Sequence, residues 1–316
     1  MAELMHNAVL DTLLEPLWPF LKTPDLIELS VVRPLEVGLE IAGNGYQFVD
    51  APHLDYEYWR FLCHVLANRS GVAFHPVRQP RISTALPEGH RFEAMLGKNV
   101  DKALSISIRI KRNIHTELEA FGVFGDIKAQ IIQMVQEGVN LLVSGGTSSG
   151  KTTFLNQLIR YIPLEKRILT VEDTRELDIP HINQKSYIVS RNETNTVIGY
   201  PEVIDHLVRS RPDVIIAGEV SVANAFPIVR MLNSGHAGFM ATIHANTPEL
   251  ALTAAMPQNI QLAGLNSSGI SDLLYQTLDI VLQLHRSEKG RREVTEILFP
   301  KSRETLNLNM HRNPTS

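Results

Sequence analysis

At 316 residues, with 44% hydrophobic and 20% charged residues, the chain has the length for two domains and the composition of a globular protein. Its single cysteine, Cys63, excludes an internal disulfide and a cysteine-cluster zinc site, and its net charge of -4 argues against a protein that coats nucleic acid. The sequence lacks an apolar run of the ~20 residues that span a membrane and lacks a secretion signal at its start, so we expect it not to be exported.

The first third of the chain predicts a small α+β domain over residues 1–110. Residues 13–21 are apolar but broken by Pro16 and Pro19, and we interpret them as a packed segment, with attachment to a membrane surface as the alternative. A hairpin turn is expected at Gly43-Asn44-Gly45 and an amphipathic helix over 54–68. The expected strands are 26–29, 37–41, 81–86, 91–96 and 104–110. Residues 111–124 are interpreted as a linker.

From residue 125 onward, apolar runs alternate with amphipathic helices. The expected helices are 127–137, 151–161, 201–210 and 222–233. The expected strands are 140–144, 167–171, 213–217, 238–243, 278–284 and 293–299. This alternation predicts a C-terminal α/β domain over 125–316, built on a mainly parallel sheet that is covered by helices on both faces.

The most informative stretch has the spacing G-x-x-x-x-G-K-T between a buried strand and a helix, which predicts a loop that holds nucleotide phosphates. Glycines let backbone N–H groups close around an anion, and the start of the helix adds its positive dipole end. We expect Lys151 to reach the β- and γ-phosphates and the Thr152 hydroxyl to bind Mg²⁺. The expected nucleotide-binding residues are Gly145, Gly146, Thr147, Ser148, Ser149, Gly150, Lys151, Thr152 and Thr153.

Acidic residues and a histidine follow three other predicted strands, and ligands of parallel sheets lie at the carboxyl ends of strands. We expect Glu172 and Asp173 to orient Mg²⁺ or its waters, with helix capping or a surface turn as the alternative. Glu219 is the candidate for orienting the attacking water or holding the metal. His244 is a candidate contact to the γ-phosphate, and His236 has a weaker case.

Four arginines are candidate phosphate contacts. Arg209 and Arg211 lie on the approach to the strand that ends in Glu219, and Arg91 and Arg109 belong to the first domain, from which they would reach a nucleotide at the domain interface. A guanidinium stabilises phosphate charge through paired hydrogen bonds, whereas an exposed arginine at a helix end is ordinarily solvated. Both interpretations stay open for these residues.

These motifs resemble those of the secretion and conjugation traffic ATPases, the ring-forming motors of type IV secretion that are related to type II secretion and pilus motors. The short length and the absence of a four-cysteine motif favour the type IV branch. Val32-Arg33-Pro34 and residues 89–109 resemble the N-terminal domain of the family less specifically. The phosphate loop, aspartate box, Walker B motif ending in Gly-Glu and histidine box of the family match Gly145–Thr152, Thr170–Thr174, Arg209–Glu219 and Ser234–Asn246.

The resemblance implies a RecA-like ATPase domain after a smaller N-terminal domain, and a Mg²⁺-dependent ATPase that powers type IV secretion or conjugative transfer and pilus assembly. It implies that Glu219 is catalytic, that His244 senses phosphate, that Lys151, Glu172 and Asp173 complete the site, and that ATP and Mg²⁺ are the cofactors. It further implies a homohexamer on the cytoplasmic face of a bacterial inner membrane, beside secretion-channel components and a coupling ATPase. The cargo, DNA or effector protein, stays open.

The chain departs from the family pattern directly after Gly218-Glu219-Val220. The family usually has Arg, then Gly or Asp, and soon a Glu-Ala pair, whereas Ser221, Val222 and Asn224-Ala225 stand here. Hydrolysis is therefore expected to be slow or tuned by partners. Two alternatives stay open: a DNA-translocating helicase-type ATPase, which the acidic charge disfavours, and a nucleotide-binding scaffold with little hydrolysis.

Overall fold

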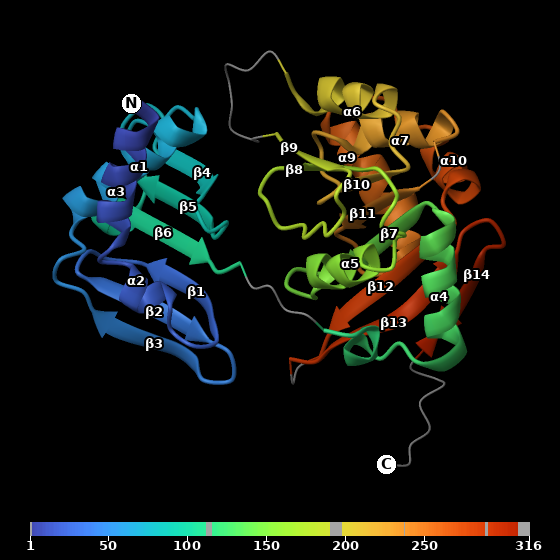
Figure 1. Cartoon of the computed structure of the whole chain (residues 1–316), viewed down its shortest axis with the longest axis horizontal. Helices are drawn as coiled ribbons and strands as arrows, with labels where there is room; N and C mark the ends of the chain where they lie inside the picture. Colours follow the sequence, from blue (N-terminus) through green and yellow to red (C-terminus); the bar gives the residue numbers. More distant parts are fainter. Residues whose placement is uncertain (1, 112–115, 190–197, 237, 288–289, 309–316) are drawn as a thin grey trace. The chain divides into compact units, whose positions relative to one another are not determined.

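The computed structural model describes residues 2–111, 116–189, 198–236, 238–287 and 290–308. These residues form two compact units, one up to residue 111 and the other from residue 116 onward (Figure 1). Part of the predicted linker, 112–115, lies outside the described residues, while Leu118 and Phe121 are buried in the second unit. Within the described ranges, every helix is too short or too polar to cross a membrane.

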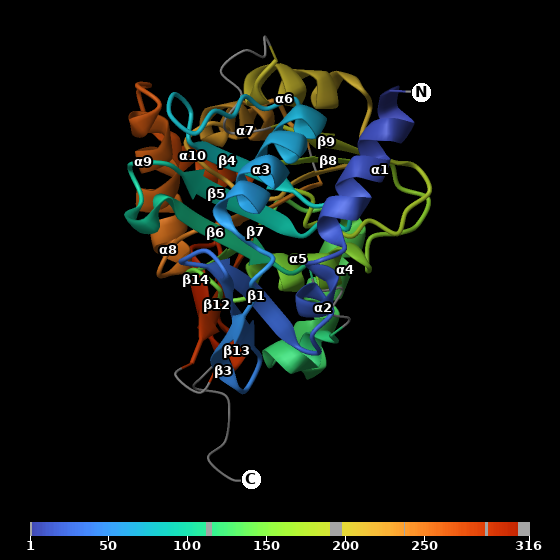
Figure 2. The same cartoon turned by 90° about the vertical axis from the view of Figure 1, so that its left-hand side faces the viewer.

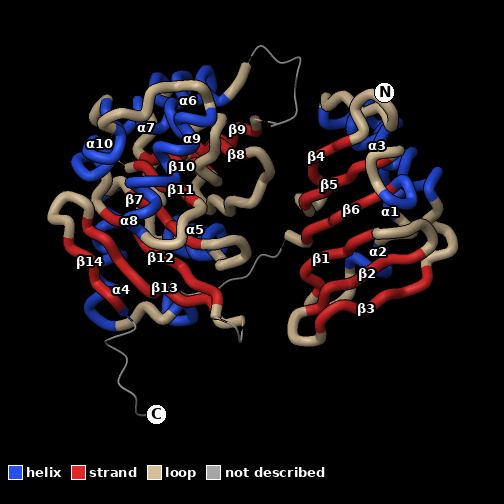
Figure 3. Tube along the Cα trace, turned by 180° about the vertical axis from the view of Figure 1, so that it is seen from behind, coloured by secondary structure: helices blue, strands red, loops and turns tan. Residues whose placement is uncertain are grey.

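The first unit is an antiparallel sheet with helices on one face. In the order β3-β2-β1-β6-β5-β4 (Figure 3), its strands are β1 (Leu26–Val31), β2 (Glu36–Ile41), β3 (Gly45–Asp50), β4 (Arg81–Ala85), β5 (Arg91–Leu96) and β6 (Leu104–Arg109). Helices α1 (Ala2–Leu14) and α3 (Tyr56–Ser70) cross one face (Figure 2), with the short α2 (Trp18–Leu21) and η1 (Asp101–Ala103) completing the unit. Leu14, Leu17 and Leu21 are buried in this core, as the packed interpretation of 13–21 predicts.

The second unit contains an eight-stranded sheet in the order β14-β13-β12-β7-β11-β10-β8-β9. The six strands from β12 to β9 are parallel, and β13 and β14 add an antiparallel edge. The strands are β7 (Leu141–Gly145), β8 (Ile168–Glu172), β9 (Gln184–Ile188), β10 (Val214–Ala217), β11 (Phe239–Ile243), β12 (Ile280–Arg286), β13 (Arg292–Phe299) and β14 (Glu304–Asn307).

Helices cover both faces of this sheet, which confirms the predicted α/β fold. One face packs against α4 (Gly125–Glu137), α5 (Lys151–Ile159) and the 3-10 helix η2 (Leu118–Phe121). The other packs against α6 (Tyr200–Arg209), α7 (Ala225–Asn233), α9 (Met256–Leu262) and α10 (Ile270–Thr277), beside α8 (Pro248–Leu250) and the π-helical η3 (Ala251–Ala255). Leu141, Leu142 and Val143 of β7 enter opposite cores in turn, and the whole strand is buried.

Candidate active site

The phosphate loop connects the end of β7 to the start of α5, and two of its glycines leave no room for a side chain. A Cβ on Gly145 would lie 2.5 Å from the carbonyl oxygen of Leu284, on the neighbouring strand. A Cβ on Gly150 would lie 2.9 Å from Cδ of Arg292, and this glycine has a φ of +92°. By contrast, the space around Gly146 is open to 4 Å. The loop is therefore packed against β12 and β13 at Gly145 and Gly150 and is open at Gly146, and this open side leaves room for phosphate.

Lys151 holds its ammonium group over this loop. Its Nζ donates to the carbonyl oxygens of Gly145 and Gly146, at 3.0 and 2.8 Å, and the residue is only 7% exposed. Loss of water lowers the pKa of Lys151 to about 8, against the opposing effect of the negative charges of Glu219 and Glu176. The ammonium group is thus a poorly solvated cation, and negatively charged phosphate oxygens placed beside it would stabilise it.

His244 lies between Lys151 and Glu219. Its Nδ1 is 3.3 Å from Nζ of Lys151, and its Nε2 is 3.3 Å from Oε1 of Glu219. Because an ammonium group only donates, Nδ1 is the acceptor, and the proton of a neutral imidazole is then on Nε2, directed at the carboxylate. The structure therefore brings together three predicted site residues, which follow β7, β10 and β11 at the same edge of the sheet.

The backbone on either side of Glu219 is fixed by two buried polar side chains. Thr242, on β11, donates its hydroxyl to the carbonyl oxygen of Gly218 at 2.7 Å. Asn224 donates its amide to the carbonyl oxygen of Glu219 and accepts from the backbone N–H of Ser221, both at 2.8 Å. Asn224 is only 1% exposed. The departure from the family pattern at this position thus provides a clamp that holds the Glu219 turn.

Glu172 is buried and serves as an acceptor for the loop that follows β8. Its Oε1 accepts from the backbone N–H groups of Glu176 and Leu177, each at 2.8 Å, and the residue is 3% exposed. Asp173, the next residue, is half-buried. This arrangement gives Glu172 a structural task, as an anchor for residues 173–177, and its role as a metal ligand stays a prediction.

Replacing Glu172 separates these two roles. Glu172→Ala leaves two backbone N–H groups without their acceptor, so we expect the free energy of unfolding to fall by about 2–4 kcal/mol in urea denaturation. Glu172→Gln keeps an acceptor oxygen, and we expect it to retain most of this stability, so that the Mg²⁺ dependence of its nucleotide binding reports whether the carboxylate also holds the metal. If Glu172→Gln is stable but needs much more Mg²⁺ than wild type, Glu172 is a metal ligand.

Glu176 is a site residue that the sequence did not reveal. Its charge acts on Lys151, and its backbone carbonyl accepts from the side-chain amide of Asn156, on α5, at 3.0 Å. The Oδ1 of the same asparagine accepts from the N–H of Asp178 at 3.0 Å, so helix and loop are tied together. Only this long-range pairing of α5 with the loop after β8 places Glu176 near the phosphate loop.

Three other candidates lie at the opposite edge of the sheet. Arg209 and Arg211 precede β10, and His236 precedes β11, whereas the phosphate loop follows the end of β7. Arg209 pairs instead with Asp205 on its own helix, at 2.9 Å. Within this chain the structure does not bring these residues to the phosphate loop, because the beginning and the end of a parallel strand lie at opposite edges.

Arg91 and Arg109 face each other on β5 and β6 of the first unit. Arg91 is 3.4 Å from Glu93, and Arg109 is 3.9 Å from Glu28. Their proposed contact with nucleotide stays a prediction.

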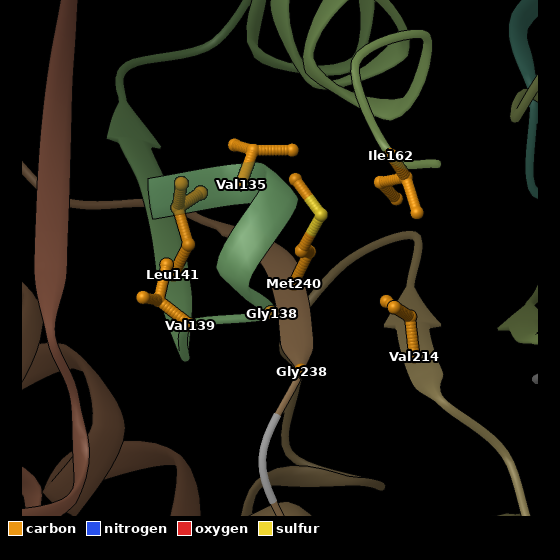
Figure 4. Close-up of a pocket in the computed structure, with 8 residues that line it drawn as sticks. All are labelled: Val135, Gly138, Val139, Leu141, Ile162, Val214, Gly238 and Met240. Carbon is orange, nitrogen blue, oxygen red and sulfur yellow. The ribbon is translucent and has the colours of Figure 1, made fainter. Parts of the chain in front are cut away.

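An apolar crevice, too narrow for a water molecule, lies where the parallel strands of the second unit begin (Figure 4). It is lined by Val135, Gly138, Val139, Leu141, Ile162, Val214, Gly238 and Met240. These side chains offer no acid, base or hydrogen-bonding group, so the crevice is not a candidate for catalysis.

The donors around the loop fit a phosphate chain with a divalent cation. The first N–H groups of α5 have no partner within the helix, and Lys151 adds a positive charge. Within the described ranges, His, Cys, Asp and Glu side chains do not gather in threes as a preformed metal site. Mg²⁺ is ordinarily held by one or two protein oxygens together with the phosphates. The half-buried Thr152, in the first turn of α5, and Asp173, directly after β8, are candidates for such oxygens.

Comparisons with known proteins show the family of the chain. Residues 84–309 match the family described as Type II/IV secretion system protein. The type IV secretion system protein VirB11 of Bartonella quintana is 30% identical over 92% of this chain and 93% of its own length. The probable conjugal transfer protein TrbB of Sinorhizobium fredii is 33% identical, over 68% of this chain and 66% of its own.

The fold is also similar to a solved structure. The X-ray structure of the ATPase DotB of Legionella pneumophila has a TM-score of 0.60 at 16% identity, covering 92% of this chain and 80% of that one. With a match to the family over most of its length and a relative at 30% identity, the chain belongs to the Type II/IV secretion system protein family.

Proposed function

We propose that this protein is an ATPase motor that hydrolyses ATP to power type IV secretion or conjugative transfer and pilus assembly. The observation that carries the proposal is the contact of His244 with both Lys151 of the phosphate loop and Glu219. A cation for the phosphates and a carboxylate for the attacking water are the two groups that ATP hydrolysis requires, and here one imidazole bridges them.

Catalysis in this proposal rests on positioning and charge rather than on covalent chemistry. Lys151 binds phosphate oxygens, and Glu219 orients a water and accepts its proton. His244, which lies between these two residues, contacts the γ-phosphate. Thr152 and Asp173 are the residues that would hold Mg²⁺, which supplies positive charge to the phosphate oxygens when bound. The clamp formed by Asn224 keeps the Glu219 backbone in place.

Phosphate release over many turnovers tests this proposal. We expect release well above the background of a Lys151→Ala variant, without stimulation by single-stranded DNA. Release at that background would favour the nucleotide-binding scaffold, and strong stimulation by single-stranded DNA would favour the helicase-type ATPase.

We further propose a homohexamer at the cytoplasmic face of a bacterial inner membrane, associated with secretion-channel components and a coupling ATPase. VirB11 is named as a type IV secretion system protein and TrbB as a probable conjugal transfer protein, which supports partners in such a system. Native mass measurement of the purified protein, with and without ATP, tests the assembly; a stable monomer in both states would contradict it.

ATP binding should weaken at alkaline pH. The pKa of Lys151 is about 8 in the free protein, and phosphate oxygens raise it in the complex, so the ammonium form that binds is lost as pH rises above 8. We expect affinity for a non-hydrolysable ATP analogue to be level near pH 7.5 and to fall by up to about tenfold per pH unit above 8. Titrations up to pH 9.5 measure this, with Lys151→Met as the pH-insensitive control. Unchanged affinity at pH 9.5 would place Lys151 away from the phosphates.

A further inference from the structure

Arg292, the first residue of β13, lies against the phosphate loop although it is 142 positions away from Gly150 in the sequence. A Cβ on Gly150 would meet Cδ of Arg292 at 2.9 Å and Cβ of Arg292 at 3.7 Å. The aliphatic part of the arginine therefore packs on the glycine that immediately precedes Lys151.

The register of the sheet explains this contact. Leu284 of β12 pairs with Gly145 at the end of β7 and, on its other side, with Val294 of β13. Arg292 is two residues from Val294, so its side chain points to the same face of the sheet. Val294 packs in the core that contains α5. Arg292 consequently lies two residues beyond the level at which β7 ends, on the face of the sheet where α5 begins.

The side chain of Arg292 is buried as far as its Nε. The ring of Phe121 lies 3.5 Å from the same Gly150 Cβ position. A second cation, Arg286 of β12, stands directly opposite Arg292 in the antiparallel pair. An anion bound at this end of the two strands would be attracted by both charges.

We propose that Arg292 binds the α- or β-phosphate of the nucleotide. Gly150 belongs to the part of a phosphate loop whose N–H groups surround these two phosphates, and a side chain that packs on Gly150 brings its charge to them. Arg292 is thus a binding residue that recognises the nucleoside diphosphate part common to ATP and ADP. His244, by contrast, contacts Lys151 and Glu219. The inference rests on the proposed ATPase function.

Equilibrium binding of ATP, ADP and inorganic tripolyphosphate to three variants tests the assignment. Arg292→Gln removes the charge and keeps most of the stem, and Arg292→Lys keeps the charge. Arg291→Gln is the matched control, because Arg291 is the next residue along, is 78% exposed and pairs with Glu293 at 3.1 Å. Thermal unfolding of each variant accompanies the titrations, so that a loss of binding is compared only among folded proteins.

We expect Arg292→Gln to lower the affinities for ATP, ADP and tripolyphosphate by a similar factor of about 10–100, as for the loss of a charged hydrogen bond. Arg292→Lys should lose less, and Arg291→Gln should bind like wild type. Wild-type affinities in Arg292→Gln would overturn the inference, as would weaker binding of ATP and ADP with unchanged tripolyphosphate, which places the contact at the base or ribose. If Arg292→Gln does not fold, Arg292→Lys takes its place as the test. It should then bind tripolyphosphate more weakly than wild type and Arg291→Gln do, and equal affinity would overturn the inference. Failure of the wild type to bind any of the three probes would instead count against the proposed function.

Discussion

Replacing Lys151 by methionine or alanine is expected to reduce phosphate release by at least about 100- to 1,000-fold, while leaving a stably folded protein. The loss follows from the removal of the cation that the phosphate loop holds over its open side. The retained stability follows from the cost of burying that cation. Its pKa in the folded chain, about 8, is below its ordinary value of 10.5, so the folded state disfavours the charged form.

The pH dependence of the free energy of unfolding gives the sign of the contribution of the Lys151 charge to stability. A folded pKa below the unfolded one makes the unfavourable contribution complete below pH 8 and absent above 10.5, so the free energy of unfolding should rise with pH across this interval. Lys151→Met should lack this rise and, at pH 7, should be at least as resistant to urea as wild type. Near-normal turnover in either variant would refute the assignment of the active site.

Glu219→Gln is expected to bind ATP and to hydrolyse it about 100- to 10,000-fold more slowly. Glutamine has the shape of glutamate but is a poor proton acceptor, and the surrounding backbone remains held by Thr242 and Asn224. Phosphate release and ATP-analogue binding, measured on the same preparation, separate the two steps. The Nε2 of His244 can still donate to the amide oxygen, so the bridge to Lys151 should survive.

A surface acid provides the control for Glu219. Asp178, in the loop after β8, is paired with Arg160 at 2.7 Å and is 44% exposed, so Asp178→Asn should behave like wild type. If Glu219→Gln loses ATP binding as well as turnover, Glu219 is a structural or metal-anchoring residue and another base must be sought.

The sequence predicts that Lys151, Glu219 and His244 lie together because their placement is local or follows from strand direction. The spacing from Gly145 to Thr152 fixes the loop, and residues that follow parallel strands must meet at one edge, which brings Glu219 and His244 to Lys151. The same rule, applied to residues that precede a strand, places Arg209 and Arg211 at the other edge. Arg292 and Glu176 depend on strand register and on loop anchoring, for which the sequence carries no periodic signal.

Several helices and strands that the sequence did not predict have no clear hydrophobic pattern. Strand β9 is the polar run Gln184–Ile188 at a sheet edge, where neither face demands apolar residues, and β14 is four residues long. Strand β3 is exposed along its whole length. The helical stretch from Pro248 to Leu262 contains a π-helical turn and an internal proline, which break the helical period.

Helix η2, at the start of the second unit, packs against the first turn of α5 and the end of the phosphate loop. Phe121 meets the ring of Phe154 edge-on, at 5.0 Å between centroids, and borders the Gly150 position that crowds Arg292. The start of α5 therefore rests on a rigid aromatic support only a few residues after the unit begins. A displacement of the first turn of α5 on nucleotide binding would therefore press on η2, the segment through which the chain enters the second unit.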